Sequence, residues 1–230
     1  MASLRAEYRL LDRAVRYAMS AAGHASPQLL TVATPCAEWD LRMLLSHLGD
    51  SLDALAEGLL DRRVGPAAGC PGAVDGPSGA LSAAGPARPA GGGADLTADL
   101  IADLAGRARA LLRACADVRS GQDVVAVADR RLTTSVVAIT GAIEVAVHGW
   151  DISVTCGDRT PVPGRLASEL LPYAALLVPR RTRPGLFADP VQVPRQTSAG
   201  DRLVAFLGRQ PGGVRPGRER WGGRDRWPGR

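Results

Sequence analysis

The most apolar stretch of the chain, residues 132–154, also carries ionisable side chains. Glu144 and His148 are four residues apart, so on a helix they lie on one face about one turn from each other. Asp151 continues the same stripe. The flanking residues are apolar, and they are Ile143, Val145, Ala146, Val147, Trp150, Ile152 and Val154. A membrane-spanning helix rarely tolerates three such polar groups, so the pattern favours a helix inside a water-soluble fold.

Two interpretations of this stripe compete. A lone Glu-x-x-x-His pair usually faces solvent, because amphipathic surface helices commonly have this form. The apolar arc here is wider than that of an ordinary surface helix, which favours a central position in the fold. A buried Glu144 and a buried His148 then need partners, and one metal ion would serve both.

Apolar residues at helical spacing predict four long helices, over residues 3–22, 41–61, 95–117 and 133–156. Asp40 is a suitable N-cap for the second of them. Shorter helices are expected over residues 164–178, which include Pro172, and over residues 200–207. Residues 124–128 fit either a short strand or an extended link. No alternation of strands and helices is apparent, so we expect an all-α four-helix bundle with short additional C-terminal helices.

We expect one domain over residues 1–210, interrupted by a mobile Gly/Pro-rich loop over residues 64–93 and followed by a disordered Arg/Gly-rich tail over residues 211–230. The tail accounts for +4 of the net charge of +5, so the nearly neutral body predicts no nucleic-acid groove. No disulfide pattern or apolar leader is visible, which predicts a cytoplasmic protein with free thiols.

His47 is a candidate third ligand, on the predicted helix over residues 41–61. It lies off the leucine face of that helix, in line with small or polar residues such as Ser51 and Gly58. A single such histidine is more often structural or at the surface, but the chain has only three, and His24 falls in a predicted loop. Two histidines and one carboxylate are a common set for a divalent metal, and three protein ligands leave an open position. Zinc is the first expectation, although nickel and iron accept the same ligands.

Three segments together resemble the DinB-like bundle proteins, in particular the mycothiol-dependent maleylpyruvate isomerase-like, metal-binding branch. The segments are Thr34-Pro-Cys-Ala-Glu-Trp-Asp40 with Leu44-Leu-Ser-His-Leu48, then Glu144-Val-Ala-Val-His-Gly-Trp-Asp151, then Leu186–Pro194 with Asp201–Gly208. The resemblance covers roughly residues 3–210. It implies a four-helix bundle with His47, Glu144 and His148 as metal ligands at one end. It also implies that the metal binds the thiol of mycothiol for isomerisation or S-transfer.

Two functions follow from this resemblance. One is a thiol-dependent transferase or isomerase that takes a small electrophilic substrate, with a metal-activated thiolate as nucleophile. The other is a non-catalytic metal-binding or regulatory module. Asp151 is the one candidate general base, although it fits equally well a role in orienting a ligand histidine or in capping a turn. Cys36 is either a reactive thiol or simply a buried one.

Truncation of the chain after Gln210 should leave the fold and the metal content unchanged. The removed residues are dense in Gly, Pro and Arg and have no apolar periodicity, so they bury little. Thermal denaturation and metal analysis of the truncated and full-length proteins test this expectation. A large fall in melting temperature, or loss of metal, would show that the tail belongs to the domain.

Overall fold

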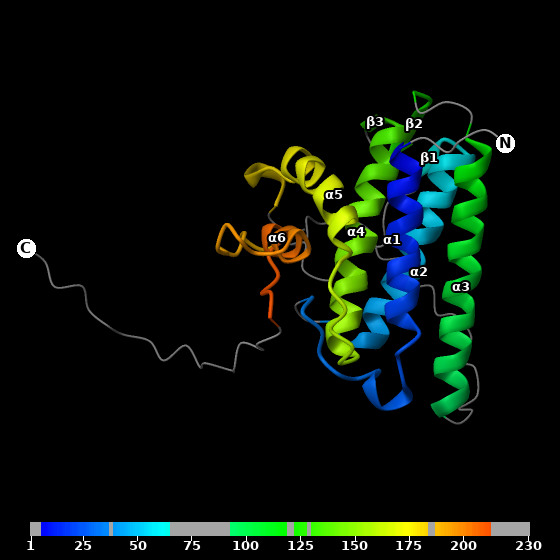
Figure 1. Cartoon of the computed structure of the whole chain (residues 1–230). Helices are drawn as coiled ribbons and strands as arrows, with labels where there is room; N and C mark the ends of the chain where they lie inside the picture. The colour runs from blue at the N-terminus through cyan, green and yellow to red at the C-terminus, as the bar shows by residue number, and fades with distance from the viewer. Residues whose placement is uncertain are drawn as a thin grey trace, which may run out of the picture.

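Four long helices lie side by side in the computed structural model, as Figure 1 shows. They are α1 (Ala6–Ala22), α2 (Leu41–Leu60), α3 (Gly93–Asp117) and α4 (Thr134–Thr155). The structure describes residues 6–36, 39–64, 93–118, 122–127, 130–183 and 187–212. The predicted all-α bundle is therefore confirmed, and each predicted long helix agrees with an observed one to within three residues at either end.

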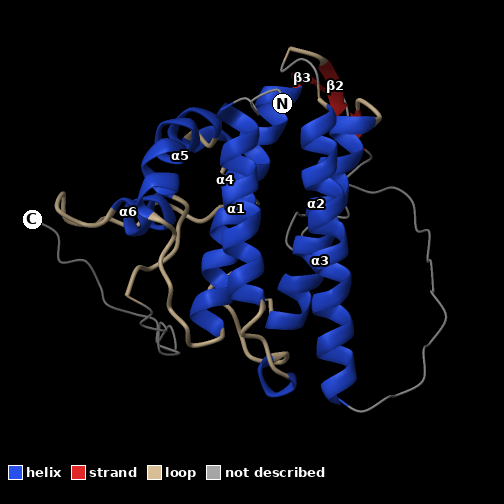
Figure 2. Cartoon of the chain, turned by 45° about the vertical axis from the view of Figure 1, so that its right-hand side comes forward, coloured by secondary structure: helices blue, strands red, loops and turns tan. Residues whose placement is uncertain are grey.

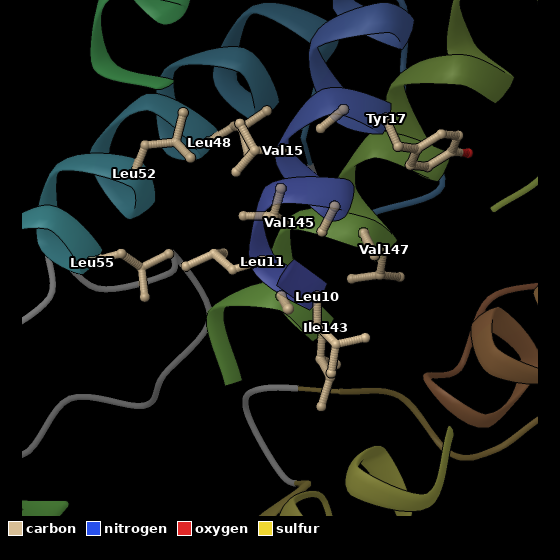
Figure 3. Close-up of a cluster of buried hydrophobic side chains, with 14 of the residues drawn as sticks. Leu10, Leu11, Val15, Tyr17, Leu48, Leu52, Leu55, Ile143, Val145 and Val147 are labelled. Carbon is tan, nitrogen blue, oxygen red and sulfur yellow. The ribbon is translucent and has the colours of Figure 1, made fainter. Parts of the chain in front are cut away.

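Helix α4 is the central helix of the bundle, packed against α1, α2 and α5 (Gly164–Leu177). It is long and apolar enough to cross a membrane, yet 83% of its most apolar window is buried inside the fold. Figure 3 shows Val145 of α4 among Leu11 and Val15 of α1 and the leucines of α2. The predicted leucine face of α2 is buried throughout, and its members are Leu41, Leu44, Leu45, Leu48, Leu52, Leu55 and Leu59. The apolarity of α4 thus reflects a core position.

Side-chain caps fix where the two helices that carry the candidate ligands begin. Asp40 accepts a hydrogen bond from the Met43 backbone N–H at 2.8 Å, which satisfies one of the free donors at the start of α2. Thr133 accepts from the Val136 N–H at 3.4 Å at the start of α4. The predicted cap at Asp40 is confirmed, and both helices start at defined residues.

A small sheet closes one end of the bundle. Strands β1 (Arg63–Val64), β2 (Val124–Val127) and β3 (Arg130–Thr133) pair in the order β1-β2-β3, with β1 parallel and β3 antiparallel to β2. The sequence predicts a possible strand only at residues 124–128, because strands of two to four residues carry too little periodicity to be recognised. Since β1 follows α2 and β3 leads into α4, the sheet lies at the end where α2 finishes and α4 starts.

Two C-terminal helices, α5 and α6 (Ala199–Phe206), pack on each other beside the bundle (Figure 2). Short 3-10 turns precede α2 at Pro27–Leu29 (η1) and follow α5 at Arg180–Thr182 (η2). Arg183 joins this unit together, because its guanidinium donates to the carbonyls of Ala188 at 2.8 Å and Phe206 at 2.7 Å. It also lies over the Phe206 ring, 4.6 Å from the centroid. The predicted C-terminal helices are confirmed, and Pro172 lies within α5.

The predicted mobile loop and tail fall mainly outside the described residues. Val64 and Gly93, the ends of the predicted loop, belong to β1 and α3, and residues 65–92 are outside. Pro211 and Gly212 form a turn, and residues 213–230 are outside. Both predictions, and the domain limits drawn from them, stay predictions.

Gly149→Ala should destabilise the fold by about 1–3 kcal/mol, because a Cβ there would lie only 2.9 Å from the Ala18 Cα of α1 and 3.0 Å from the Tyr17 ring. Gly106→Ala on α3 is the matched control. A Cβ at Gly106 meets nothing within 4 Å, so the higher helix propensity of alanine should stabilise by up to about 1 kcal/mol. Urea denaturation measures both, and equal effects in the two variants would contradict the close α1–α4 contact.

Candidate functional site

His47, Glu144 and His148 lie together where α2 faces α4. His47 Nε2 is 3.3 Å from Glu144 Oε1, and the rings of His47 and His148 are 5.1 Å apart at their centroids and nearly perpendicular. One donor atom from each of the three residues lies within 4.8 Å of the other two. His47 is in the second turn of α2 and His148 is in the last two turns of α4, so the cluster lies towards the end of the bundle away from the sheet.

Glu144 is held in place by a side chain of α2. Ser51 Oγ donates to Glu144 Oε1 at 2.6 Å, and the same hydroxyl lies 3.5 Å from His47 Nε2. Burial alone would raise the pKa of Glu144. Hydrogen bonding with His47, the nearby charge of His148 and the Ser51 hydrogen bond together outweigh burial and hold that pKa below its ordinary value. Glu144 is therefore present as a carboxylate, the form that binds metals.

His148 is oriented by Asp151, one turn further along α4. His148 Nδ1 lies 3.3 Å from Asp151 Oδ2, so Nε2 is the nitrogen that can face His47 and Glu144. Asp151 in turn accepts two hydrogen bonds from Arg209, from Nε to Oδ1 at 3.2 Å and from Nη2 to Oδ2 at 2.8 Å. The Asp151 side chain is fully buried and that of Arg209 is 8% exposed.

Pairing with Arg209 keeps the buried carboxyl group of Asp151 ionised. Burial would raise the pKa of Asp151, but the charge of Arg209 and the hydrogen bonds from His148 and Arg209 lower it below its ordinary value. Burial would likewise lower the pKa of Arg209, and Asp151 raises it instead. Asp151 and Arg209 therefore form a buried ion pair behind His148.

The segment between α1 and α2 supplies an aromatic wall. The buried Trp39 ring lies 4.5 Å from the His47 ring and 6.1 Å from the His148 ring, with the second pair stacked. A β-bridge between Ala33 and Asp40 and a hydrogen bond from the Thr34 N–H to the Trp39 carbonyl fix this segment. Trp39 thus restricts the rotation of both candidate ligand rings.

Cys36 comes from the same segment and belongs to a second donor group. Its Sγ, a nitrogen of His148 and an oxygen of Asp151 also lie within 4.8 Å of one another. Cys36 is partly buried, and Cys36, Cys115 and Cys156 are free thiols. Burial raises the pKa of Cys115 to about 12 and that of Cys156 to about 11, so neither thiol is reactive at neutral pH.

The first cluster has a dry side and a wet side. The His148 side chain is 9% exposed, whereas His47 is 23% and Glu144 is 34% exposed. A ligand from solvent would therefore approach past His47 and Glu144. His24 belongs elsewhere, since its side chain is half exposed and its Nδ1 lies 3.7 Å from Asp158.

The sequence pattern predicts no role in the site for three residues that contribute to it. Ser51 stands out only as a small neighbour of His47, and Trp39 only as part of a motif, although both lie near the start of the predicted helix over residues 41–61. Arg209 follows α6, 58 residues after Asp151, and no local pattern connects the two. Orientation of His148 by Asp151 is one of the alternatives that the sequence predicts, and the observed geometry agrees with it.

Comparison with known proteins matches residues 8–153 to the family model described as the mycothiol maleylpyruvate isomerase N-terminal domain. The matched span contains His47, Glu144, His148 and Asp151 and ends before α5. Two curated relatives, both uncharacterized proteins from strains of Mycobacterium tuberculosis, are 41% identical over 68 residues. That alignment covers 29% of this chain and 37% of the length of each relative. No solved structure matches. Because the family model covers more than half of the chain, the protein belongs to the mycothiol maleylpyruvate isomerase N-terminal domain family.

Proposed function

We propose that His47, Glu144 and His148 bind one divalent metal ion, with zinc as the first candidate, and that the ion binds the thiol of mycothiol or a similar small thiol. The observation that carries the proposal is the convergence of three donor atoms within 4.8 Å from two facing helices. Two imidazoles and a carboxylate are a ligand set that zinc, nickel and iron share.

The distance between His47 and Glu144 fits a metal centre. Zinc bonds to nitrogen and oxygen of about 2.0–2.2 Å at tetrahedral angles place neighbouring donors about 3.4 Å apart. His47 Nε2 and Glu144 Oε1 are 3.3 Å apart. Glu144 and His148 each also have an outer partner, Ser51 and Asp151, as ligands of metal sites usually do.

The coordination position that the three protein ligands leave open would face the solvent-exposed side of the cluster. When bound, a divalent ion favours the thiolate form of a coordinated thiol. Trp39 and the buried His148 close the dry side, while the partly exposed His47 and Glu144 leave the approach from solvent open. A reducing cytoplasm would keep such a small thiol available.

A thiol transferase fits the arrangement better than a reaction that needs a separate base. Asp151 is the candidate base from the sequence, but both of its oxygens are bound by Arg209 and one also by His148. It therefore orients His148, and the thiolate itself would be the nucleophile towards a small electrophilic substrate.

A non-catalytic metal-binding or regulatory module is the second candidate. It is favoured by the same observation, since Asp151 is committed to Arg209 and is not available for proton transfer. The two functions differ in whether the metal-loaded protein consumes mycothiol in the presence of a generic electrophile. Consumption supports the transferase, and metal and thiol binding without turnover supports the module.

His148→Ala should abolish stoichiometric metal binding, because the two remaining ligands seldom hold zinc against water. His24→Ala is the control and should keep its metal, since His24 is half exposed and pairs with Asp158. Metal analysis of the purified variants measures both, and binding of mycothiol should follow the metal. Full metal content in the His148 variant would contradict the proposed site.

Ser51→Ala should weaken metal binding by about tenfold, because Glu144 loses the hydroxyl that fixes its Oε1. Ser168→Ala on the exposed face of α5 is the matched control, since that hydroxyl donates to the Arg165 carbonyl of its own helix. Competition with a chelator of known affinity measures the change. An unaltered affinity in the Ser51 variant would show that Glu144 does not need this hydrogen bond.

A further inference from the structure

Two sets of metal donors overlap on one histidine. His47, Glu144 and His148 form the first set, and Cys36, His148 and Asp151 form the second. Within each set the donor atoms lie within 4.8 Å of one another, and thiolate, imidazole and carboxylate all suit zinc. Asp151 lies at Nδ1 of His148, whereas Nε2 is the nitrogen that can face His47 and Glu144, so a single ion can be bound by only one of the two sets.

Arg209 interacts with two of the three donors of the second set. It binds both oxygens of Asp151, at 3.2 and 2.8 Å, and it also interacts with Cys36. Its remaining nitrogen donates to the Leu207 carbonyl at 3.2 Å. A guanidinium does not lose its proton in proteins. A divalent ion at Asp151 would therefore have to displace a buried permanent cation.

The position of Arg209 is fixed by the C-terminal unit. The Arg209 N–H donates to the Val204 carbonyl at 2.9 Å, and Gly208 before it adopts a positive φ of 85°. Arg183 ties the same unit together through the Ala188 and Phe206 carbonyls. The segment that positions the Arg209 guanidinium beside Asp151 therefore lies outside the residues matched to the family.

We propose that Arg209 assigns the metal to the His47–Glu144–His148 set by occupying Asp151 and Cys36. It is a positioning residue that acts through Asp151 on His148. Loss of its positive charge frees the carboxylate and the thiol, and the Cys36–His148–Asp151 set then takes the metal, with the Cys36 proton released to solvent. The inference rests on the proposed metal site, and it adds the residue that decides which of the two donor sets binds the ion.

Cobalt(II) in place of zinc distinguishes the two sets, because a thiolate ligand adds a sulfur-to-cobalt charge-transfer band in the near ultraviolet. Wild-type protein without added thiol should lack the band. Arg209→Gln should show it, and the Arg209→Gln/Cys36→Ser double variant should lose it again. Arg209→Lys keeps the positive charge but not the paired hydrogen bonds to Asp151, and it should still lack the band, which makes it the control for charge.

A second test keeps Arg209 in place, so it does not depend on whether the Arg209 variants fold. Cys36→Ser alone should leave the cobalt spectrum and affinity as in the wild type, because Cys36 is not a ligand while Arg209 is present. A changed cobalt spectrum or affinity in that variant overturns the proposal. Arg209→Gln that folds and binds cobalt without the band overturns it as well, whether or not its affinity falls.

Failure of this inference is distinct from failure of the proposed function. A wild-type chain that binds no cobalt contradicts the metal site itself, and the assignment of donor sets falls with it. A wild-type chain that binds cobalt, beside a folded Arg209→Gln variant with the wild-type spectrum, contradicts only the role of Arg209.

Discussion

The buried ion pair between Asp151 and Arg209 is the interaction on which the rest of the site depends. Asp151 is fully buried in α4, and a carboxylate without a partner in such a place is strongly unfavourable. Removing one partner of a buried pair typically costs about 3–5 kcal/mol, mostly because the other charge is left alone. Once Arg209 holds Asp151 as an anion, Asp151 can accept from His148 and fix its ring. The orientation of a candidate metal ligand is therefore decided by a residue 58 positions further along the chain.

Helix α4 also packs closely against α1. At Gly149, directly after His148, the Ala18 backbone approaches so closely that no side chain fits without movement. Tyr17, which lines the same contact, donates to the Thr160 carbonyl beyond the end of α4. Since protein interiors are close-packed and respond little to small shifts, the helix that carries Glu144 and His148 has little freedom to move against its neighbours. The site thus has a rigid base and gains its access from the exposed sides of His47 and Glu144.

Most of the helical architecture could be predicted from the sequence because long periodic segments carry a strong signal. The leucine face of α2, the cap at Asp40 and the central position of α4 follow from local patterns, and the structure confirms them. The juxtaposition of His47 with Glu144 came from the small-residue stripe on α2 and from the family resemblance. The sheet was largely missed, since Arg63–Val64 is too short to show a period. Arg209 was missed because an ion pair between distant segments leaves no local pattern.

The division of the site between the family-matched bundle and the C-terminal unit has a chemical consequence. The matched residues supply every proposed ligand, and the added unit supplies the charge that faces Asp151 from behind. A metal site built from α2 and α4 alone would leave an anionic Asp151 near His148 and Cys36, which is itself an attractive place for a cation. A buried guanidinium removes that competitor without adding a ligand. The C-terminal helices are therefore part of the proposed metal site in the electrostatic sense, although none of their residues is proposed to touch the ion.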